Sequence, residues 1–227
     1  VSEDGGVAAA YDVIPGTWRT SYPETTGYII PTFLSYAKLE NDASYFDIAK
    51  KMGDWEIAIQ SPLGGGGEPG GVYLPRPRIF NTAQVMLGWL DLYRETGDNR
   101  YLTATERAGE FVIGNLDGEG KWTDFTFNGP KSYHSRVVWA LLELYAVTQN
   151  TEYRSAAELA TNWILDQSQP NGWFANNGWG KAEPYSHQIG YTLVGLAKVL
   201  GLRGAACDYG RIEQVLLVAS DSIVEAY

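Results

Sequence analysis

Cysteine, histidine and basic residues are scarce in this sequence. A single cysteine, Cys207, excludes an internal disulfide and a thiolate cluster of the kind that holds structural zinc. The 17 Lys and Arg residues are outnumbered by 27 Asp and Glu residues, which gives a formal net charge of -10. No basic run or basic helix face offsets this charge, so the chain is not expected to bind nucleic acid.

Long apolar runs are missing as well. The longest, from Val137 to Val147, contains Glu143 and is shorter than the roughly 20 residues that cross a bilayer, so no membrane partner is expected. The first residues show no basic segment followed by an apolar one, as expected if a signal peptide is absent or already removed. The sequence does not determine the cellular compartment. A hydrophobic content of 44% is ordinary for a packed globular chain.

A repeat roughly 55 residues long is the main positive feature. Three aligned segments each end one helix and begin the next: L-S-Y-A-K-L-E-N-D-A-S-Y from Leu34, L-D-L-Y-R-E-T-G-D-N-R-Y from Leu90 and L-E-L-Y-A-V-T-Q-N-T-E-Y from Leu142. A weaker fourth copy covers 189–200. In each unit the first helix is apolar nearly all round and the second is amphipathic, a pattern typical of an inner helix covered by an outer one.

The repeat predicts an all-α chain of four helical hairpins within one domain that spans 1–227. We expect more than half of all residues in helices, at 24–39, 43–60, 81–96, 99–115, 133–148, 151–168, 187–201 and 209–225. Asp42, Asp98 and Asn150 stand where they would cap the outer helices. The returns 60–79, 115–132 and 169–186 are long, and each has a glycine closely followed by an aromatic residue. This composition predicts ordered turns or short hairpins in functional loops.

This arrangement resembles the six-hairpin glycosidase superfamily and the (α/α) toroids of polysaccharide lyases and uronyl epimerases. The segment from Ser21 to Thr32, S-Y-P-E-T-T-G-Y-I-I-P-T, is similar to the first inner helix of uncharacterised bacterial proteins associated with exopolysaccharide synthesis. The resemblance covers essentially the whole chain and implies an (α/α) toroid that binds and processes carbohydrate. Because four hairpins are present where a closed toroid has six or seven, we expect a fragment, an open ring, or a ring that another chain completes.

The starts of the inner helices and the loops before them are expected at one end of the toroid, where aromatic faces could stack on sugar rings. The aromatic candidates for substrate binding are Trp18, Tyr22, Tyr73, Trp122, Trp173 and Trp179. The basic candidates are Arg19, Arg76, Arg78 and Arg136, because a guanidinium group binds the carboxylate of a uronic acid bidentately. The alternatives are that the aromatics pack beneath the loops and that the arginines pair with acidic residues of the protein.

Glycoside hydrolysis needs two carboxyl groups, and Glu24 and Asp124 are the leading catalytic candidates. Glu24 lies in the first turn of the first inner helix. Its alternative role is a capping box with Ser21 as the N-cap. Asp124 is flanked by Trp122, Phe125 and Phe127, so among the loop carboxyl groups it is expected in the most apolar setting.

The two histidines fall near the starts of consecutive inner helices, and each has a tyrosine close by. The pairs are Tyr133 with His134 and Tyr185 with His187. On a shared rim the histidines could act as general base and acid in β-elimination or epimerisation of a uronate. The alternative is that each one hydrogen-bonds a neighbouring loop. We expect these four side chains to line one concavity together with Glu24 and Arg78.

Toroid enzymes that catalyse other reactions need sequence motifs that this chain lacks. Terpene-forming enzymes need an Asp-rich box that is absent here, and lanthionine cyclases and protein prenyltransferases hold zinc with cysteine and histidine. The glycines 64–67 are followed by Glu68-Pro69 and not by G-K-[ST], so they form no phosphate loop. No metal and no cofactor are expected.

The sequence therefore predicts a carbohydrate-active, glycoside hydrolase-like enzyme that acts on a polysaccharide or oligosaccharide. Uronate-containing glycans are among the candidate substrates. Lyase or epimerase chemistry is one alternative, and a non-catalytic glycan-binding or scaffold module is another. An apolar stripe on the last helix, formed by Ile212, Val215, Leu216, Val218, Ala219 and Ile223, predicts an interface with a second copy or with further hairpins that complete the ring.

Overall fold

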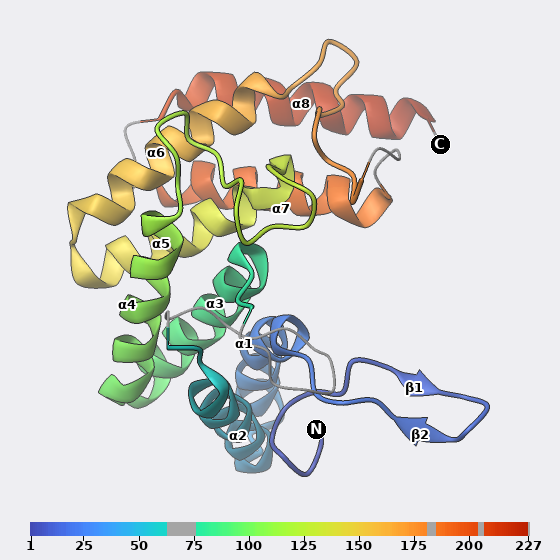
Figure 1. The fold of residues 1–227 in the computed structure, drawn as a ribbon, viewed down its shortest axis with the longest axis vertical. Helices are drawn as coiled ribbons and strands as arrows, with labels where there is room; N and C mark the ends of the chain where they lie inside the picture. The colour runs from blue at the N-terminus through green and yellow to red at the C-terminus, as the bar shows by residue number, and fades with distance from the viewer. Residues whose placement is uncertain (63–75, 181–184, 204–206, 227) are drawn as a thin grey trace. The chain divides into compact units, whose positions relative to one another are not determined.

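Helices make up nearly all the regular structure of the computed structural model, which describes residues 1–62, 76–180, 185–203 and 207–226 (Figure 1). Two thirds of the described residues are helical, so the expected helical majority is confirmed. The chain divides into two compact units, Val1–Val112 and Ile113–Tyr227. A single domain spanning 1–227 stays a prediction.

The first unit consists of a small hairpin and two helical hairpins. Strands β1 (Tyr11–Asp12) and β2 (Thr17–Trp18) pair antiparallel and precede the helices α1 (Pro23–Glu40), α2 (Ala43–Ile59), α3 (Ile79–Thr96) and α4 (Asn99–Gly114). Helix α1 packs against both α2 and α3. The first helix of one hairpin therefore lies against its own partner and against the first helix of the next hairpin.

The second unit repeats this arrangement. A 3-10 turn, η1 (Ser132–His134), leads into α5 (Ser135–Thr148), which is followed by α6 (Thr151–Asp166), α7 (Ser186–Leu202) and α8 (Tyr209–Ala226). Helix α5 packs on α6 and α7, and α7 packs on α8. The helices α1 to α8 each begin and end within two residues of the predicted boundaries. Among the described residues, no helix is long and apolar enough to cross a membrane.

The short turns between inner and outer helices repeat in backbone conformation. Asn41, Gly97 and Gln149 occupy the same position of the three aligned segments, and each ends its helix with a left-handed φ of 52°, 67° and 58°, respectively. The predicted caps of the outer helices are confirmed at α2, α4 and α6, and at α4 the Asp98 side chain accepts a hydrogen bond from the Arg100 N–H at 3.0 Å. The side chain of Asp42 accepts a hydrogen bond from the Ser44 N–H at 2.8 Å, and that of Asn150 accepts one from Glu152 at 3.0 Å.

The long returns also repeat. Leu116 pairs with Trp122 and Ser168 with Phe174 in isolated antiparallel bridges, with the left-handed glycines Gly120 and Gly172 at the turns. The predicted short hairpins are therefore confirmed in the second and third returns. Most of the first return, including Tyr73, lies outside the described residues.

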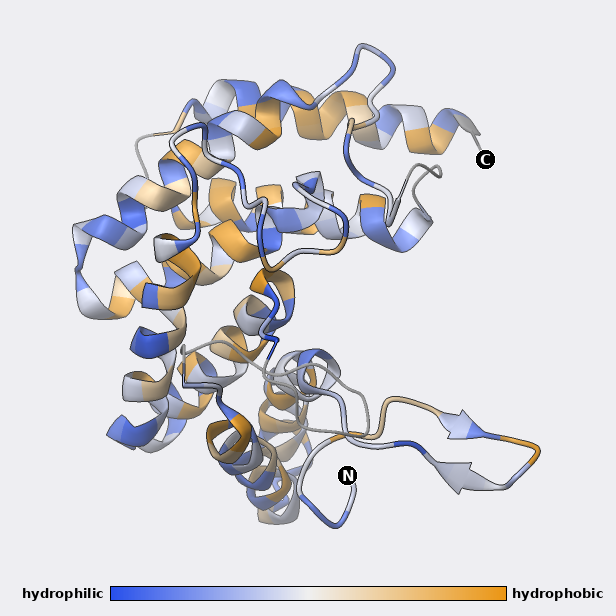
Figure 2. Ribbon diagram, viewed as in Figure 1, coloured by the Kyte–Doolittle hydropathy of each residue, from blue (hydrophilic) through white to orange (hydrophobic). Residues whose placement is uncertain are grey.

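Burial follows the predicted division into inner and outer helices only in part. Nearly every residue of α3 from Ile79 to Leu92 is buried, and so are seven of the 14 residues of α5. The inner helices α1 and α7, with five of 18 and six of 17 residues buried, are no more buried than the outer helices α4 and α6, with seven and six of 16. Hydrophobic residues lie along the helices, and they also reach the tip of the β1–β2 hairpin (Figure 2). On α8, Ile212 and Ala219 of the predicted stripe are buried within the unit, whereas Val218 and Ile223 stay exposed. The uncovered stripe is therefore narrower than expected.

Glycines set the close approach of the inner helices. A Cβ atom on Gly27 of α1 would lie 2.6 Å from Cα of Val85 in α3, and one on Gly88 of α3 would lie 2.5 Å from the carbonyl oxygen of Gly27. In the second unit, a Cβ atom on Gly195 of α7 would lie 2.5 Å from the carbonyl carbon of Ser135 in α5. These are backbone contacts, so no side-chain rotation relieves them.

We predict that Gly195→Ala destabilises the second unit by about 1 to 3 kcal/mol or more, because overpacking forces the two helices apart. Gly190 lies in the same helix, where an added Cβ atom would meet nothing within 4 Å. The control variant Gly190→Ala should therefore be neutral or stabilise by roughly 0.5 to 1 kcal/mol through helix propensity. Urea unfolding of both variants measures the difference, and equal effects would contradict the packing argument.

A buried carboxyl group lies in the first unit. Glu56 of α2 is 1% exposed, and its two carboxyl oxygens have no hydrogen-bond partner among the described residues. Burial raises the pKa of Glu56 well above its ordinary value of 4.5, so the group is held in the protonated form as the pH rises. The unfolded chain loses this proton first.

The free energy of unfolding of the first unit should therefore be highest at acid pH and should fall as the pH rises above about 4.5, by up to about 1.4 kcal/mol per pH unit. Glu56→Gln should flatten this slope, because the amide does not ionise. Glu110→Gln, at an exposed position of α4, serves as the control and should leave the slope unchanged. Chemical unfolding at a series of pH values provides the measurement, and a slope that persists in Glu56→Gln would refute the assignment.

Candidate functional site

Exposed aromatic rings gather at the start of α7 in the second unit. The Trp179 ring centroid lies 5.1 Å from that of His187 and 5.8 Å from that of Tyr185. Tyr185 and His187 stack with an interplanar angle of 12°, and His187 meets Tyr191 edge-on at 5.7 Å. Trp179 is 53% exposed and Tyr185 62% exposed. The structure therefore brings together three of the predicted site residues.

Local hydrogen bonds hold this group in place. His187 and Tyr191 are four residues apart in α7 and so share a helix face. The Thr192 hydroxyl donates to Asn177 Oδ1 at 3.0 Å, which ties the segment before Trp179 to α7. The Asn128 side chain donates to the Trp179 carbonyl oxygen at 2.8 Å. The second and third returns therefore both contribute to positioning the rings.

Cationic side chains continue the group along α5 and α7. The Arg136 guanidinium lies 5.0 Å from the Tyr191 ring centroid and 5.4 Å from that of Trp139, and Lys198 Nζ lies 4.9 Å from Trp139. These are cation–π distances. We call this series the aromatic strip, and its members are Trp179, Tyr185, His187, Tyr191, Arg136, Trp139 and Lys198.

The aromatic strip has the chemistry of a glycan platform. Flat apolar rings with polar edges can stack on the C–H face of a sugar, while the cations and the ring hydroxyls can bind its oxygen atoms. Sequence reasoning missed Tyr191, Trp139 and Lys198 because it treated α5 and α7 as buried. The i, i+4 and i+7 spacing of His187, Tyr191 and Val194, with Lys198 on the same face, was the signal available in the sequence.

Tyr133, His134 and Trp122 lie in the core of the second unit. Their exposed fractions are 3%, 2% and 1%, respectively. The Trp122 and Tyr133 rings meet the His134 imidazole edge-on at 5.5 and 5.3 Å. The expectation that Trp122 offers its face to a ligand is wrong, because the hairpin of the second return turns it inward. His134 and His187 do not share a surface, since only His187 is exposed.

Burial, followed by the positive charge of Lys131, lowers the pKa of His134 to about 3. The imidazole is therefore neutral at physiological pH, and its Nδ1 atom is buried without a partner among the described residues. A buried neutral imidazole fits a structural position in the unit better than proton transfer to a bound sugar.

Asp124 and Trp173 are the other second-unit candidates. Asp124 is exposed, so the apolar setting expected from its aromatic neighbours is not present. The next residue, Phe125, has a left-handed φ of 55°, which turns the chain at this point. Trp173 is 41% exposed and follows the left-handed Gly172.

In the first unit, Glu24 is linked to the start of α3. The Asn81 side chain donates to the Tyr22 hydroxyl at 3.2 Å, and that hydroxyl donates to Glu24 Oε2 at 3.0 Å. The capping box with Ser21 as N-cap is wrong, because Tyr22 is the N-cap and makes no side-chain cap bond. The Ser21 hydroxyl instead donates to Asp4 Oδ1 at 2.8 Å.

The arginines of the first unit differ in their surroundings. Arg78 is half-buried as the N-cap of α3, and Arg76 is exposed. Arg19 binds Asp12 through two nitrogen atoms at 2.7 to 3.0 Å, so this guanidinium is engaged within the β1–β2 hairpin. Trp18 is 70% exposed on the same hairpin. A concavity shared by Glu24, Arg78, Tyr185 and His187 stays a prediction, whereas Tyr133 and His134 are buried and do not join His187 on a common surface.

Comparison with solved structures gives the class of fold. A GH76 α-mannanase from Bacteroides thetaiotaomicron, solved as a selenomethionine derivative, matches with a TM-score of 0.65 and 18% sequence identity. The match covers 87% of this chain and 56% of that structure, so the chain spans little more than half its length. No family model matches, and no curated protein matches. The chain therefore has the all-α helical-hairpin fold of the (α/α) toroid class.

Because the folded-state pKa of His134 lies below the ordinary value of 6.5, the unfolded chain binds the proton first as the pH falls. We predict that the free energy of unfolding of the second unit is maintained above about pH 6.5 and falls toward pH 3 by about 1.4 kcal/mol per pH unit. His134→Gln should remove this part of the acid slope. NMR of the His134 imidazole should show no titration above pH 4, and a titration near pH 6 would contradict its burial.

Proposed function

We propose that this chain acts on a polysaccharide as a glycoside hydrolase-like enzyme and that the aromatic strip binds the glycan. The exposed rings of Trp179, Tyr185 and His187 carry the proposal, and the likeness in fold to an α-mannanase supports it. The likeness of the 21–32 segment to exopolysaccharide-associated proteins supports an exopolysaccharide as the polymer class.

The cations at one end of the aromatic strip support a uronate-containing glycan. Arg136 and Lys198 lie over the Trp139 ring, whose indole N–H donates to Glu143 Oε1 at 2.9 Å, so two cations and one carboxylate meet at this end of the strip in a protein with a formal net charge of -10. A sugar carboxylate that reached them would be attracted, whereas the rest of the protein would repel it.

For the acid of the reaction we propose Glu24, which is half-exposed and hydrogen-bonded by the Tyr22 hydroxyl at the start of α1. Asp124 stays a second candidate, with an exposed carboxyl group that is accessible to a substrate. Arg76 and Arg78 are proposed to bind the substrate at the start of α3. Two carboxyl groups about 5 to 9.5 Å apart are needed, and their separation decides between retention and inversion.

Two alternatives rest on particular observations. Tyr185 and His187 lie stacked at the surface 5.9 Å apart, which suits proton transfer in β-elimination or epimerisation of a uronate. The burial of Tyr133 and His134 instead favours a glycan-binding module without turnover, because it removes two of the six catalytic candidates from the surface.

Assembly as a homodimer, or with further hairpins, is proposed from the exposed Val218 and Ile223 of α8 and is tested by light scattering.

The deciding experiment incubates the chain with α-mannan and with neutral and uronate-containing polysaccharides, following new reducing ends and the absorbance of unsaturated uronates together. A hydrolase releases reducing ends alone, a lyase releases both signals, and an epimerase or a binding module releases neither. We predict that Glu24→Gln lowers hydrolysis by about 10²-fold or more while glycan binding is retained. Full activity in this variant would exclude Glu24 as the acid of the reaction.

Binding is tested at the strip by calorimetry. Trp179→Ala should weaken glycan affinity by roughly three- to tenfold, because stacking of one ring contributes about 0.5 to 1.5 kcal/mol. Lys198→Gln should lower the affinity for uronate-containing ligands only, and this loss of affinity should diminish at high salt. Tyr36→Ala removes an exposed ring from α1 and is the control. Equal losses in Trp179→Ala and Tyr36→Ala would refute the strip as the binding surface.

A further inference from the structure

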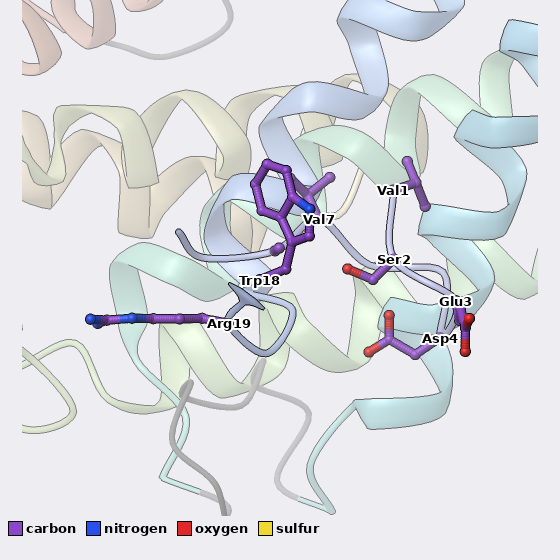
Figure 3. Close-up of a pocket in the computed structure, with 8 residues that line it drawn as sticks. Val1, Ser2, Glu3, Asp4, Val7, Trp18 and Arg19 are labelled. Carbon is purple, nitrogen blue, oxygen red and sulfur yellow. The ribbon is translucent and has the colours of Figure 1, made fainter. Parts of the chain in front are cut away.

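A cavity of 680 Å³ lies beside the β1–β2 hairpin of the first unit (Figure 3). It is lined by Val1, Ser2, Glu3, Asp4, Val7, Ala8, Trp18 and Arg19. Its volume is in the range of small-ligand sites, which run from about 300 to 1,000 Å³. Neither the fold comparison nor the aromatic strip accounts for this cavity.

The Trp18 indole forms one wall and is held in place. The ring of Tyr11, its partner across the strand pair, lies 4.8 Å away at a tilt of 58°. The bidentate Arg19–Asp12 ion pair joins the two strands beside it. Despite this support the indole is 70% exposed, so one face is available to a ligand without rearrangement of the backbone.

A second wall carries oxygen atoms. Ser2, Glu3 and Asp4 lie together to one side of Trp18, with the Ser2 hydroxyl turned toward the indole and the Glu3 carboxyl group farthest from it (Figure 3). Asp4 Oδ1 accepts hydrogen bonds from the Gly6 N–H at 3.1 Å and from the Ser21 hydroxyl, which fixes this carboxylate. A carboxylate and a serine hydroxyl are acceptors for the hydroxyl groups of a sugar.

Two buried glycines hold this wall against α2. A Cβ atom on Gly5, which has a φ of 102°, would lie 2.9 Å from the Lys51 carbonyl oxygen. One on Gly6 would lie 2.9 Å from the Trp55 ring. Gly5 and Gly6 are therefore packed on the helix, whereas Val1, Glu3 and Asp4 remain exposed beside the cavity.

The charge of the lining selects among sugars. Glu3 and Asp4 are acidic, and the basic side chain of the described lining, Arg19, is already bound by Asp12. A uronate would meet two carboxylates, the α-amino group of Val1 in the 227-residue chain and a guanidinium that is already paired, whereas a neutral sugar meets a ring to stack on and acceptors for its hydroxyls. This preference is opposite to that of the cationic end of the aromatic strip.

We infer that the cavity beside Trp18 is a second sugar site, which binds one or two residues of a neutral glycan. The site is independent of turnover, because none of its lining residues belongs to the aromatic strip or to the proposed acid. A chain with both sites would hold an acidic and a neutral part of a heteropolysaccharide, or of two chains, at once.

The test follows the Trp18 indole N–H by NMR while the 227-residue chain is titrated with methyl glycosides of mannose, glucose, galactose and xylose, and with glucuronic acid. At least one neutral glycoside should shift this resonance with saturation at or below roughly 10 mM, and glucuronic acid should bind at least about fivefold more weakly. The variants at position 18 lack this resonance, so their affinities are read from the backbone amide of Val7, which also lines the cavity. Trp18→Ala should lose at least about fivefold in neutral-sugar affinity, and Trp18→Phe should retain most of it because a stacking face remains.

Trp179→Ala provides the control and should leave this binding unchanged. If no glycan binds at the aromatic strip but neutral sugars still shift the Trp18 resonance, the proposed function is rejected and the second sugar site is retained. No shift with any neutral glycoside, tighter binding of glucuronic acid, or unchanged affinity in Trp18→Ala would each overturn the inference.

Discussion

The close packing of glycine-bearing inner helices is the constraint on which both units depend. Gly27 and Gly88 let α1 and α3 approach backbone to backbone, and Gly195 does the same for α7 and α5. Because backbone atoms form the contact, the distance between the helices has little freedom. Helix α7 is therefore fixed relative to α5, and so are the side chains that each helix contributes to the aromatic strip.

The aromatic strip follows directly from that packing. Tyr191 and His187 project from α7 while Arg136 and Trp139 project from α5, so the series is continuous only while the two helices keep their separation. The returns then add Trp179 and Tyr185 at one end, held by Asn128 and Asn177. Rigid helices supply the platform and the loops supply its edge, a division common in binding sites.

Local signals in the sequence predicted the helices, and tertiary packing decided the site. Asp42 and Asn150 mark helix starts by side-chain chemistry, and the residues aligned with Gly97 mark helix ends, so the boundaries could be predicted from a few residues. The burial of Trp122 could not be predicted from the sequence. A short hairpin, with Gly120 packed against Leu159, turns its side chain inward. The settings of His134 and Asp124 were misjudged for the same reason, since spacing places a residue near a rim and does not say whether its side chain is covered.

Two of the buried titratable groups, Glu56 and His134, are expected to shift the stabilities of the two units in opposite directions as the pH falls. Glu56 makes the first unit weaker in alkali, and His134 makes the second unit weaker in acid. Each unit taken by itself therefore has its own favoured pH range, and a rise in pH shifts the balance of stability from the first unit toward the second. Acid thus favours retention of the Trp18 hairpin, and alkali favours retention of the aromatic strip.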